Sequence, residues 1–223
     1  DGILHEIRTR KNVAPHAVLR KMGFMLGVLQ DVRPTAENVA ILGCYPPFIS
    51  PHVLRAYFRV LNKYGVEFTV LDDEVCCGWM ALERAVAEED REALKKAQLA
   101  SNGFMKKNVD CAREKGAKNL LHFCEWCVYA YSRAGNEGAF GKPGQNMGQL
   151  TLLAPIFGKL DTIRLRLENP TIIGYYEGCY RRSHAVFPEV KIDWSPYRTI
   201  MNRIENASIV DLPNKCCVTN SEL

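Results

Sequence analysis

The distribution of the nine cysteines constrains this chain more than any other feature of its sequence. They include two adjacent pairs, Cys76-Cys77 and Cys216-Cys217, whose members cannot bridge each other without strain. The odd count and the 47% of hydrophobic residues also argue against a secreted disulfide framework. In a reducing compartment, cysteines at this density are typical of metal or cluster binding. We therefore predict a metal-binding protein, with a disulfide framework and inert thiols as the alternatives.

Each cysteine group in the first part of the chain follows a segment that is expected to form a strand. Three short apolar or β-branched runs have this character: 39–42, 66–71 and 119–123. Cys44, the Cys76-Cys77 pair and the Cys124/Cys127 pair come after them in that order. In parallel sheets, ligands collect at the carboxyl ends of the strands. We therefore expect these five cysteines to converge on one site.

Helices are expected between these strands. Residues 51–64 carry an apolar stripe at helical spacing. Residues 91–115 form a longer helical region, which Asp90 is expected to cap at its N-terminus and Gly116 to end. Strands that alternate with helices predict an α/β fold with short parallel sheets.

The pattern restarts after a glycine-rich stretch, residues 135–148. A strand-like segment ends at Cys179, and a helix over 195–204 and a strand over 207–212 lead to Cys216-Cys217. We interpret this as an internal duplication whose second copy lacks the CxxC pair. The predicted segments are a helical lead-in over 1–38, a first unit over 39–134, a connector and helix over 135–168, and a second, incomplete unit over 169–223.

Written out, the first cysteine set is Cys44-x31-Cys76-Cys77-Gly78-x45-Cys124-x2-Cys127. This pattern resembles the CCG-domain family, the cysteine-rich domain of heterodisulfide reductase and of related iron–sulfur subunits. The first interval fits the family pattern, and the second is longer here. The second copy, Cys179-x36-Cys216-Cys217, has Val218 in place of the glycine.

The resemblance implies that Cys44, Cys76, Cys77, Cys124 and Cys127 together bind a noncubane [4Fe–4S] cluster. The residues alone show only that five thiolates exceed the four that a cubane cluster or a tetrahedral zinc site requires. Structural zinc on four of them stays open, because zinc sites share the CxxC spacing. Cys179, Cys216 and Cys217 would form a second site with only three ligands.

The resemblance also implies a function. The expected role is the catalytic or electron-transfer subunit of a heterodisulfide reductase-like complex, which reduces a disulfide to two thiols. Other redox subunits, ferredoxin-like and flavin-containing, are the expected partners. The alternatives are an electron-relay subunit of a membrane-peripheral dehydrogenase of the glycolate/lactate or glycerol-3-phosphate type, and a zinc-stabilised interaction domain.

Several residues near the cysteines have two interpretations each. Arg181, Arg182 and His184 follow Cys179, and they either form a solvated basic turn or hold an anionic thiol substrate. His122 is interpreted as a structural histidine and Cys111 as a thiol of the hydrophobic core. Trp79 and Trp126 flank cluster cysteines and are expected to exclude water.

Charge and hydropathy exclude some other classes. The net charge of +4 comes with no basic block, which argues against nucleic-acid binding. No run approaches the 18 apolar residues of a membrane span, and no signal peptide is visible. We expect a cytoplasmic protein, peripheral to the membrane at most through its partners. The chain opens at Asp1 rather than Met, and the lead-in resembles the tail of a missing ferredoxin-like module.

Overall fold

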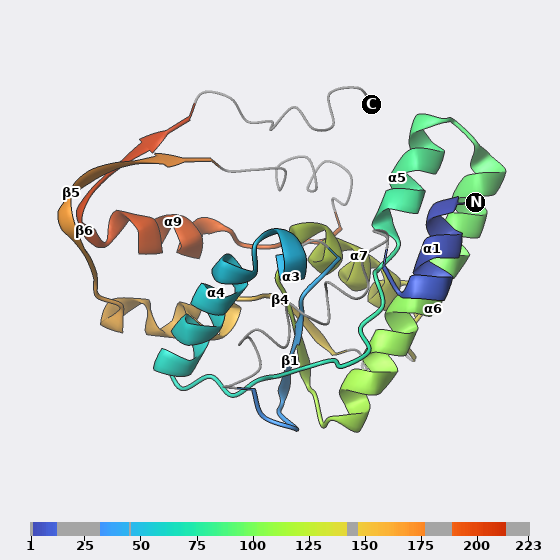
Figure 1. Ribbon diagram of the computed structural model, residues 1–223, viewed down its shortest axis with the longest axis horizontal. Coiled ribbons are helices and arrows are strands. Elements are labelled where there is room, and N and C mark those ends of the chain that lie inside the picture. The colour runs from blue at the N-terminus through green and yellow to red at the C-terminus, as the bar shows by residue number, and fades with distance from the viewer. Residues whose placement is uncertain (1, 13–31, 45, 142–146, 177–188, 213–223) are drawn as a thin grey trace. The chain divides into compact units, whose positions relative to one another are not determined.

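The structure is a computed structural model that describes residues 2–12, 32–44, 46–141, 147–176 and 189–212 (Figure 1). It divides into two compact units, Asp1–Pro155 and Ile156–Leu223. Helices and parallel strands alternate along both units, so the predicted α/β class is confirmed. No helix in these described ranges is long and apolar enough to cross a membrane.

The elements of the first unit are α1 (Gly2–Arg10), β1 (Asn38–Ile41), α3 (Pro46–Ile49), α4 (Pro51–Lys63), β2 (Thr69–Val70), α5 (Trp79–Ala87), α6 (Arg91–Glu114), β3 (Asn119–His122), α7 (Glu125–Asn136) and β4 (Gly148–Thr151). The three strands and the two helices that the sequence predicted here are all present. The helices α5 and α7 and the strand β4 were not predicted.

The four strands form one parallel sheet in the order β2-β1-β3-β4. In its register, Val39 of β1 lies opposite Thr69 of β2 on one side and Leu120 of β3 on the other. Both β1 and β3 are almost completely buried, as expected for central strands that are covered on two faces.

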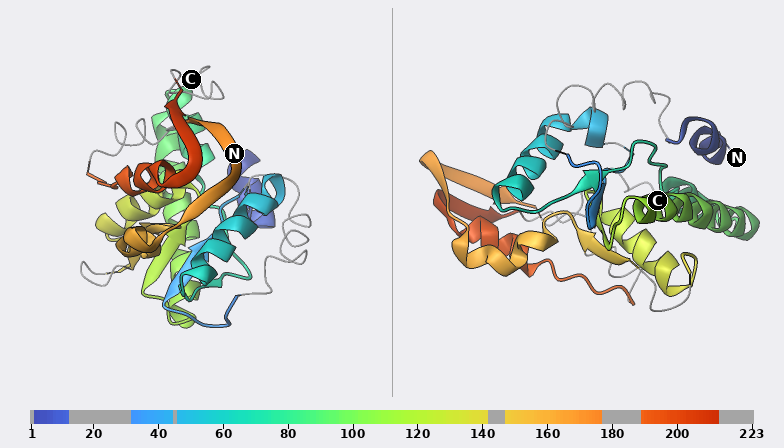
Figure 2. Two further views of the ribbon diagram at one scale, coloured as in Figure 1. Left: turned by 90° about the vertical axis from the view of Figure 1, so that its left-hand side faces the viewer. Right: turned by 90° about the horizontal axis from the view of Figure 1, so that it is seen from below.

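Helices cover the two faces of this sheet. On one face, α6 and α7 pack Met105, Val109 and Tyr131 against Val39 and Ile41 of β1. Helix α4 lies on the opposite side of β1 (Figure 2, right) and buries the apolar side chains of its stripe. Neighbouring strand residues point to opposite faces, so both faces of β1 are apolar.

The long helix α6 begins where the sequence predicted. The carboxylate of Asp90 accepts hydrogen bonds from the backbone N–H groups of Glu92 and Ala93, at 3.0 and 2.9 Å. Gly116 follows the helix with a φ of +82°, which is the left-handed conformation of a glycine C-cap. The helix therefore ends at a fixed point before β3.

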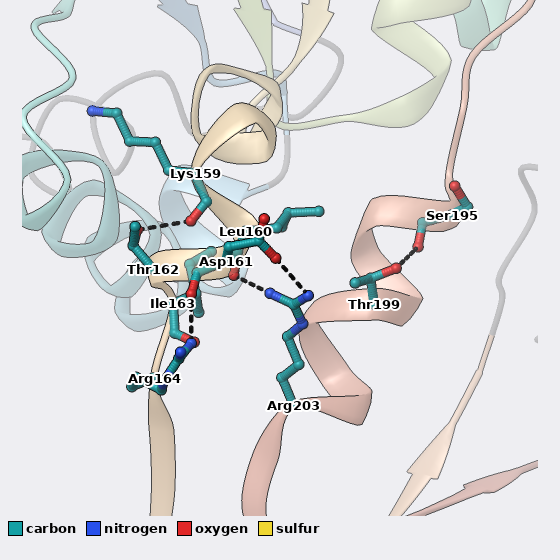
Figure 3. A network of polar contacts seen from close by, with 9 residues as sticks. All are labelled: Lys159, Leu160, Asp161, Thr162, Ile163, Arg164, Ser195, Thr199 and Arg203. Carbon is teal, nitrogen blue, oxygen red and sulfur yellow. Dashed lines mark hydrogen bonds and ion pairs between the residues drawn. The ribbon is translucent and has the colours of Figure 1, made fainter.

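The second unit contains the 3₁₀ helix η2 (Ala154–Thr162, whose first two residues precede the unit boundary), β5 (Leu165–Tyr175), α9 (Ser195–Asn202) and β6 (Ile204–Asp211). Strands β5 and β6 pair in parallel. After α9, Arg203 donates to the carbonyl oxygen of Leu160 and pairs with Asp161 at 2.9 Å (Figure 3). This contact ties the end of η2 to the start of β6.

Each unit thus contains two parallel strands joined by a helix, β1–α4–β2 in the first and β5–α9–β6 in the second. This repeat accords with an internal duplication. The four predicted segments and their boundaries stay a prediction.

Candidate functional site

The cysteines of the first set follow three neighbouring strands of the parallel sheet. Cys44 comes three residues after β1, the Cys76-Cys77 pair follows β2, and Cys124 lies two residues after β3. Cys124 is the N-cap residue of α7, and Cys127 lies in the first turn of that helix. Because the strands run in the same direction, the three segments leave the sheet at the same edge.

The sulfur atoms of these five residues are in contact in a series. The Sγ of Cys127 lies 3.7 Å from the Sγ of Cys77. The remaining links are thiol hydrogen bonds, between Cys44 and Cys76, Cys76 and Cys77, and Cys124 and Cys127. All five are free cysteines. No three cysteine, histidine or acidic side chains within the described residues have the geometry of a site for one metal ion.

The thiols share protons unequally. The hydrogen bond from Cys127, with a second from Cys76, lowers the pKa of Cys77 to about 6 in spite of burial. The hydrogen bond from Cys127 also lowers the pKa of Cys124. Donation to Cys124 and Cys77, together with burial, raises the pKa of Cys127 itself. Two thiolates are therefore favoured on either side of one shared thiol donor.

The other two thiols are held protonated. The hydrogen bond with Cys76 and burial raise the pKa of Cys44. For Cys76, the hydrogen bond with Cys44 lowers the pKa, but the bond with Cys77 and burial outweigh it. Metal binding to such a set releases protons, because the ligand is the thiolate. Five soft sulfur donors at one buried edge fit an iron–sulfur group in their chemistry.

The Cys76-Cys77 turn is fixed by α6. Ser101 of α6 donates its hydroxyl to the carbonyl oxygen of Cys77 at 2.6 Å, and the N–H of Gly78 points to the Sγ of Cys76 at 3.5 Å. Gly78 has a φ of +82°, and a Cβ on it would lie 3.4 Å from Ser101 and Phe104. The glycine of the Cys-Cys-Gly motif is therefore required by both backbone conformation and space.

A buried amide on α6 supports the same turn. The side chain of Asn108 accepts a hydrogen bond from the N–H of Val75 at 2.8 Å and donates to the carbonyl oxygen of Val75 at 2.6 Å. It also donates to the hydroxyl of Tyr131 at 2.6 Å. Burial and the charges of Cys127 and Glu74 raise the pKa of Tyr131. Asn108 thus joins the segment before Cys76 to α7.

Comparison with known families connects this geometry to a known domain. The family model described as a cysteine-rich domain, CCG, matches residues 39–130. The chain carries a CCG domain. The match includes all five cysteines of the site and ends within α7.

Relatives of this chain are iron–sulfur or reductase proteins by name. One subunit of the dihydromethanophenazine:CoB–CoM heterodisulfide reductase of Methanosarcina acetivorans is 28% identical over 190 residues, which cover 82% of this chain and 42% of the relative. The corresponding protein of Methanosarcina mazei is 25% identical over 194 residues, covering 83% and 44%. An uncharacterized iron–sulfur protein of Methanocaldococcus jannaschii is 23% identical over 222 residues, covering 96% and 40%. The chain spans less than half the length of these relatives, and no solved structure matches it.

Two tryptophans cover part of the CCG domain's cysteine site. Trp79 begins α5 directly after Gly78, and Trp126 lies between Cys124 and Cys127. Their rings stack with centroids 4.7 Å apart and planes 13° apart. Both are half-buried, so the stack forms a wall between two cysteine segments and solvent. This agrees with the expectation that they exclude water.

His122 and Cys111 occupy structural positions in the CCG domain. The buried ring of His122 contacts Gln149 of β4 through Nε2 at 2.7 Å and packs against Tyr131. Burial lowers the pKa of His122 to about 4. Cys111 packs against the hydrophobic core and is not part of the sulfur series.

The residues of the predicted second site lie outside the described residues: Cys179, Cys216 and Cys217, with Arg181, Arg182 and His184. Their roles stay predictions. Sequence reasoning also missed polar residues that support the first site: Asn12, Glu74, Ser101 and Asn108. Asn108 alone offered a signal, because a polar amide on the buried face of a helix needs a partner.

Proposed function

We propose that this chain is the iron–sulfur subunit of a heterodisulfide reductase-like oxidoreductase. The observation that carries the proposal is the unbroken series of five cysteine sulfurs at the carboxyl edge of the parallel sheet. The names of the relatives support the reductase class, and the CCG domain supports an iron–sulfur group.

The finer proposal is a noncubane [4Fe–4S] cluster held by Cys44, Cys76, Cys77, Cys124 and Cys127. When bound, such a cluster would supply one-electron chemistry and an affinity for sulfur. The chain's own residues hold the five thiolates in place, and the stacked tryptophans limit the access of water. Burial also disfavours excess negative charge, so a cationic group is needed before all five thiols lose their protons.

The reaction that we propose is disulfide reduction. A disulfide takes up two electrons and two protons, its S–S bond breaks, and two thiols leave. The two electrons come from partner redox subunits, ferredoxin-like and flavin-containing, because this chain shows no nucleotide-binding fingerprint of its own.

The test is anaerobic reconstitution with ferrous iron and sulfide, followed by iron and sulfide analysis and electron paramagnetic resonance. We expect about four irons per chain at this site. The substitution Cys76→Ser should abolish the spectrum, whereas Cys111→Ser, a matched change outside the series, should leave it intact. Cys216→Ser should also leave it intact. Colourless protein that retains stoichiometric zinc after reconstitution would contradict the proposal and favour the zinc-stabilised domain.

A further inference from the structure

Cys44 differs from the other four cysteines in how it is held. It has no cysteine neighbour in sequence, and it lies in a short segment without regular structure between β1 and α3. The preceding Gly43 has a φ of +80°, and a Cβ on it would lie 3.4 Å from the Cβ of Cys124. Neither a helix nor a strand therefore fixes the position of Cys44.

A buried carboxylate fixes the backbone before Cys44. Glu74 is only 3% exposed, and its two oxygens accept hydrogen bonds from the N–H groups of Leu42 and Gly43, both at 2.9 Å. Glu74 precedes Cys76 by two residues. One side chain therefore couples the segment of the lone cysteine to the segment of the Cys-Cys pair.

A buried amide fixes the backbone after this point. Asn12 is fully buried and donates its Nδ2 hydrogen to the carbonyl oxygen of Cys44 at 3.1 Å. Its neighbour Lys11 accepts a hydrogen bond from the N–H of Cys76 through its carbonyl oxygen at 2.9 Å. Both residues lie outside the matched CCG region, at the end of the segment that begins with α1. The N-terminal segment is thus attached to two of the cysteine loops.

We propose that Glu74 and Asn12 are positioning residues that hold Cys44 as the fifth ligand of the cysteine centre. Glu74 acts on the two N–H groups before the cysteine, and Asn12 acts on its carbonyl. This inference rests on the proposed function only for the word ligand. The positioning of the thiol is a property of the chain and can be measured without metal.

The first experiment uses reduced, metal-free protein and measures the alkylation rate of each cysteine with iodoacetamide by mass spectrometry. In Glu74→Gln, the amide presents a donor to one of the two N–H groups, so one hydrogen bond is lost. In Asn12→Ala, the donor to Cys44 is lost. We expect Cys44 to react about tenfold faster in each variant, the change that 1.4 kcal/mol of lost restraint gives. The rates at Cys77 and Cys127 should stay within twofold, since their supports are untouched.

Matched controls are Glu114→Gln and Asn62→Ala, because both residues are exposed and lie far along the chain from the cysteine loops. The second experiment records the paramagnetic spectrum of the iron-loaded protein. Loss of positioning at Cys44 should move the spectrum of Glu74→Gln toward that of Cys44→Ala, with bound iron retained by the other four cysteines. A merely structural role would lower stability without this spectroscopic change.

The outcomes separate the two proposals. Absence of iron uptake by the wild-type protein would overturn the proposed function, and the alkylation rates would still decide the positioning. If Glu74→Gln loses cooperative unfolding, Asn12→Ala decides, because it acts on Cys44 from a different segment. Unchanged Cys44 reactivity in both variants, or equal acceleration at all five cysteines, would overturn the inference.

Discussion

Replacement of Asn108 by alanine should destabilise the first unit more than any exposed substitution. The change removes three hydrogen bonds of a side chain that is 1% exposed. Two of the partners are the N–H and C=O groups of Val75, which are then left buried without a partner. The third partner, the hydroxyl of Tyr131, loses only a donor.

The size of the effect follows from the orphaned groups. Each buried polar group without a partner costs about 1–3 kcal/mol, so the two groups of Val75 together give about 4 kcal/mol. This is a large fraction of the 5–15 kcal/mol that typically separates folded from unfolded domains. With a urea m-value of about 2 kcal/mol/M, the unfolding midpoint should fall by about 2 M.

The assay is equilibrium unfolding of reduced, metal-free protein, followed by tryptophan fluorescence. A Trp194→Phe background removes the one tryptophan of the second unit, so Trp79 and Trp126 report on the first unit alone. The control is Asn62→Ala, an exposed helical position where the same change should stay within about 0.5 kcal/mol. A midpoint for Asn108→Ala equal to that of the control would refute the reasoning, because it would mean that Val75 does not depend on this amide.

Three further outcomes are expected. Gly78→Ala should destabilise the unit by about 1 kcal/mol or more because of its positive φ, whereas Gly103→Ala, in the open middle of α6, should stabilise it by about 0.5–1 kcal/mol; opposite signs in thermal unfolding check the pair. Asp90→Ala should cost about 1 kcal/mol through loss of the helix cap, and equal stability to wild type would contradict the capping role. The pKa of His122 is lowered from 6.5 to about 4, so its contribution to stability is complete above pH 6.5 and is lost as pH falls toward 4, by about 3 kcal/mol in all; a His122→Phe variant should lose this share of the acid dependence in urea titrations at stepped pH.

The positions of the cysteines relative to the strands were predictable because two periodicities decide them. Apolar runs before Cys44 and Cys124 required buried strands, and helical patterns between them required parallel crossovers. The convergence of the five cysteines on one edge then followed from the direction of the strands. The cap at Asp90 was readable because capping depends on neighbours in sequence.

What the sequence could not provide depends on contacts between distant residues. Strand β4 has the sequence Gly148-Gln-Leu-Thr151, which lacks an apolar run, and it forms because β3 offers it a free edge. Helix α7 begins within the CxxC pair, where the interest of the cysteines hides the helical pattern. The buried acceptors of Glu74 and the amide of Asn12 have no local signature, since their partners lie 32 residues away or about as far.

The order of the strands also bears on the synthesis of the protein. Strand β3 inserts beside β1 although it is made after β2, so the loops of Cys44 and Cys124 meet only once a long stretch of chain has left the ribosome. At about 5–20 residues per second, this delay lasts several seconds. During that time Cys44, Cys76 and Cys77 are nascent thiols without their later neighbours. We expect metal delivery to follow translation of α7, and the cell must keep these thiols reduced until then.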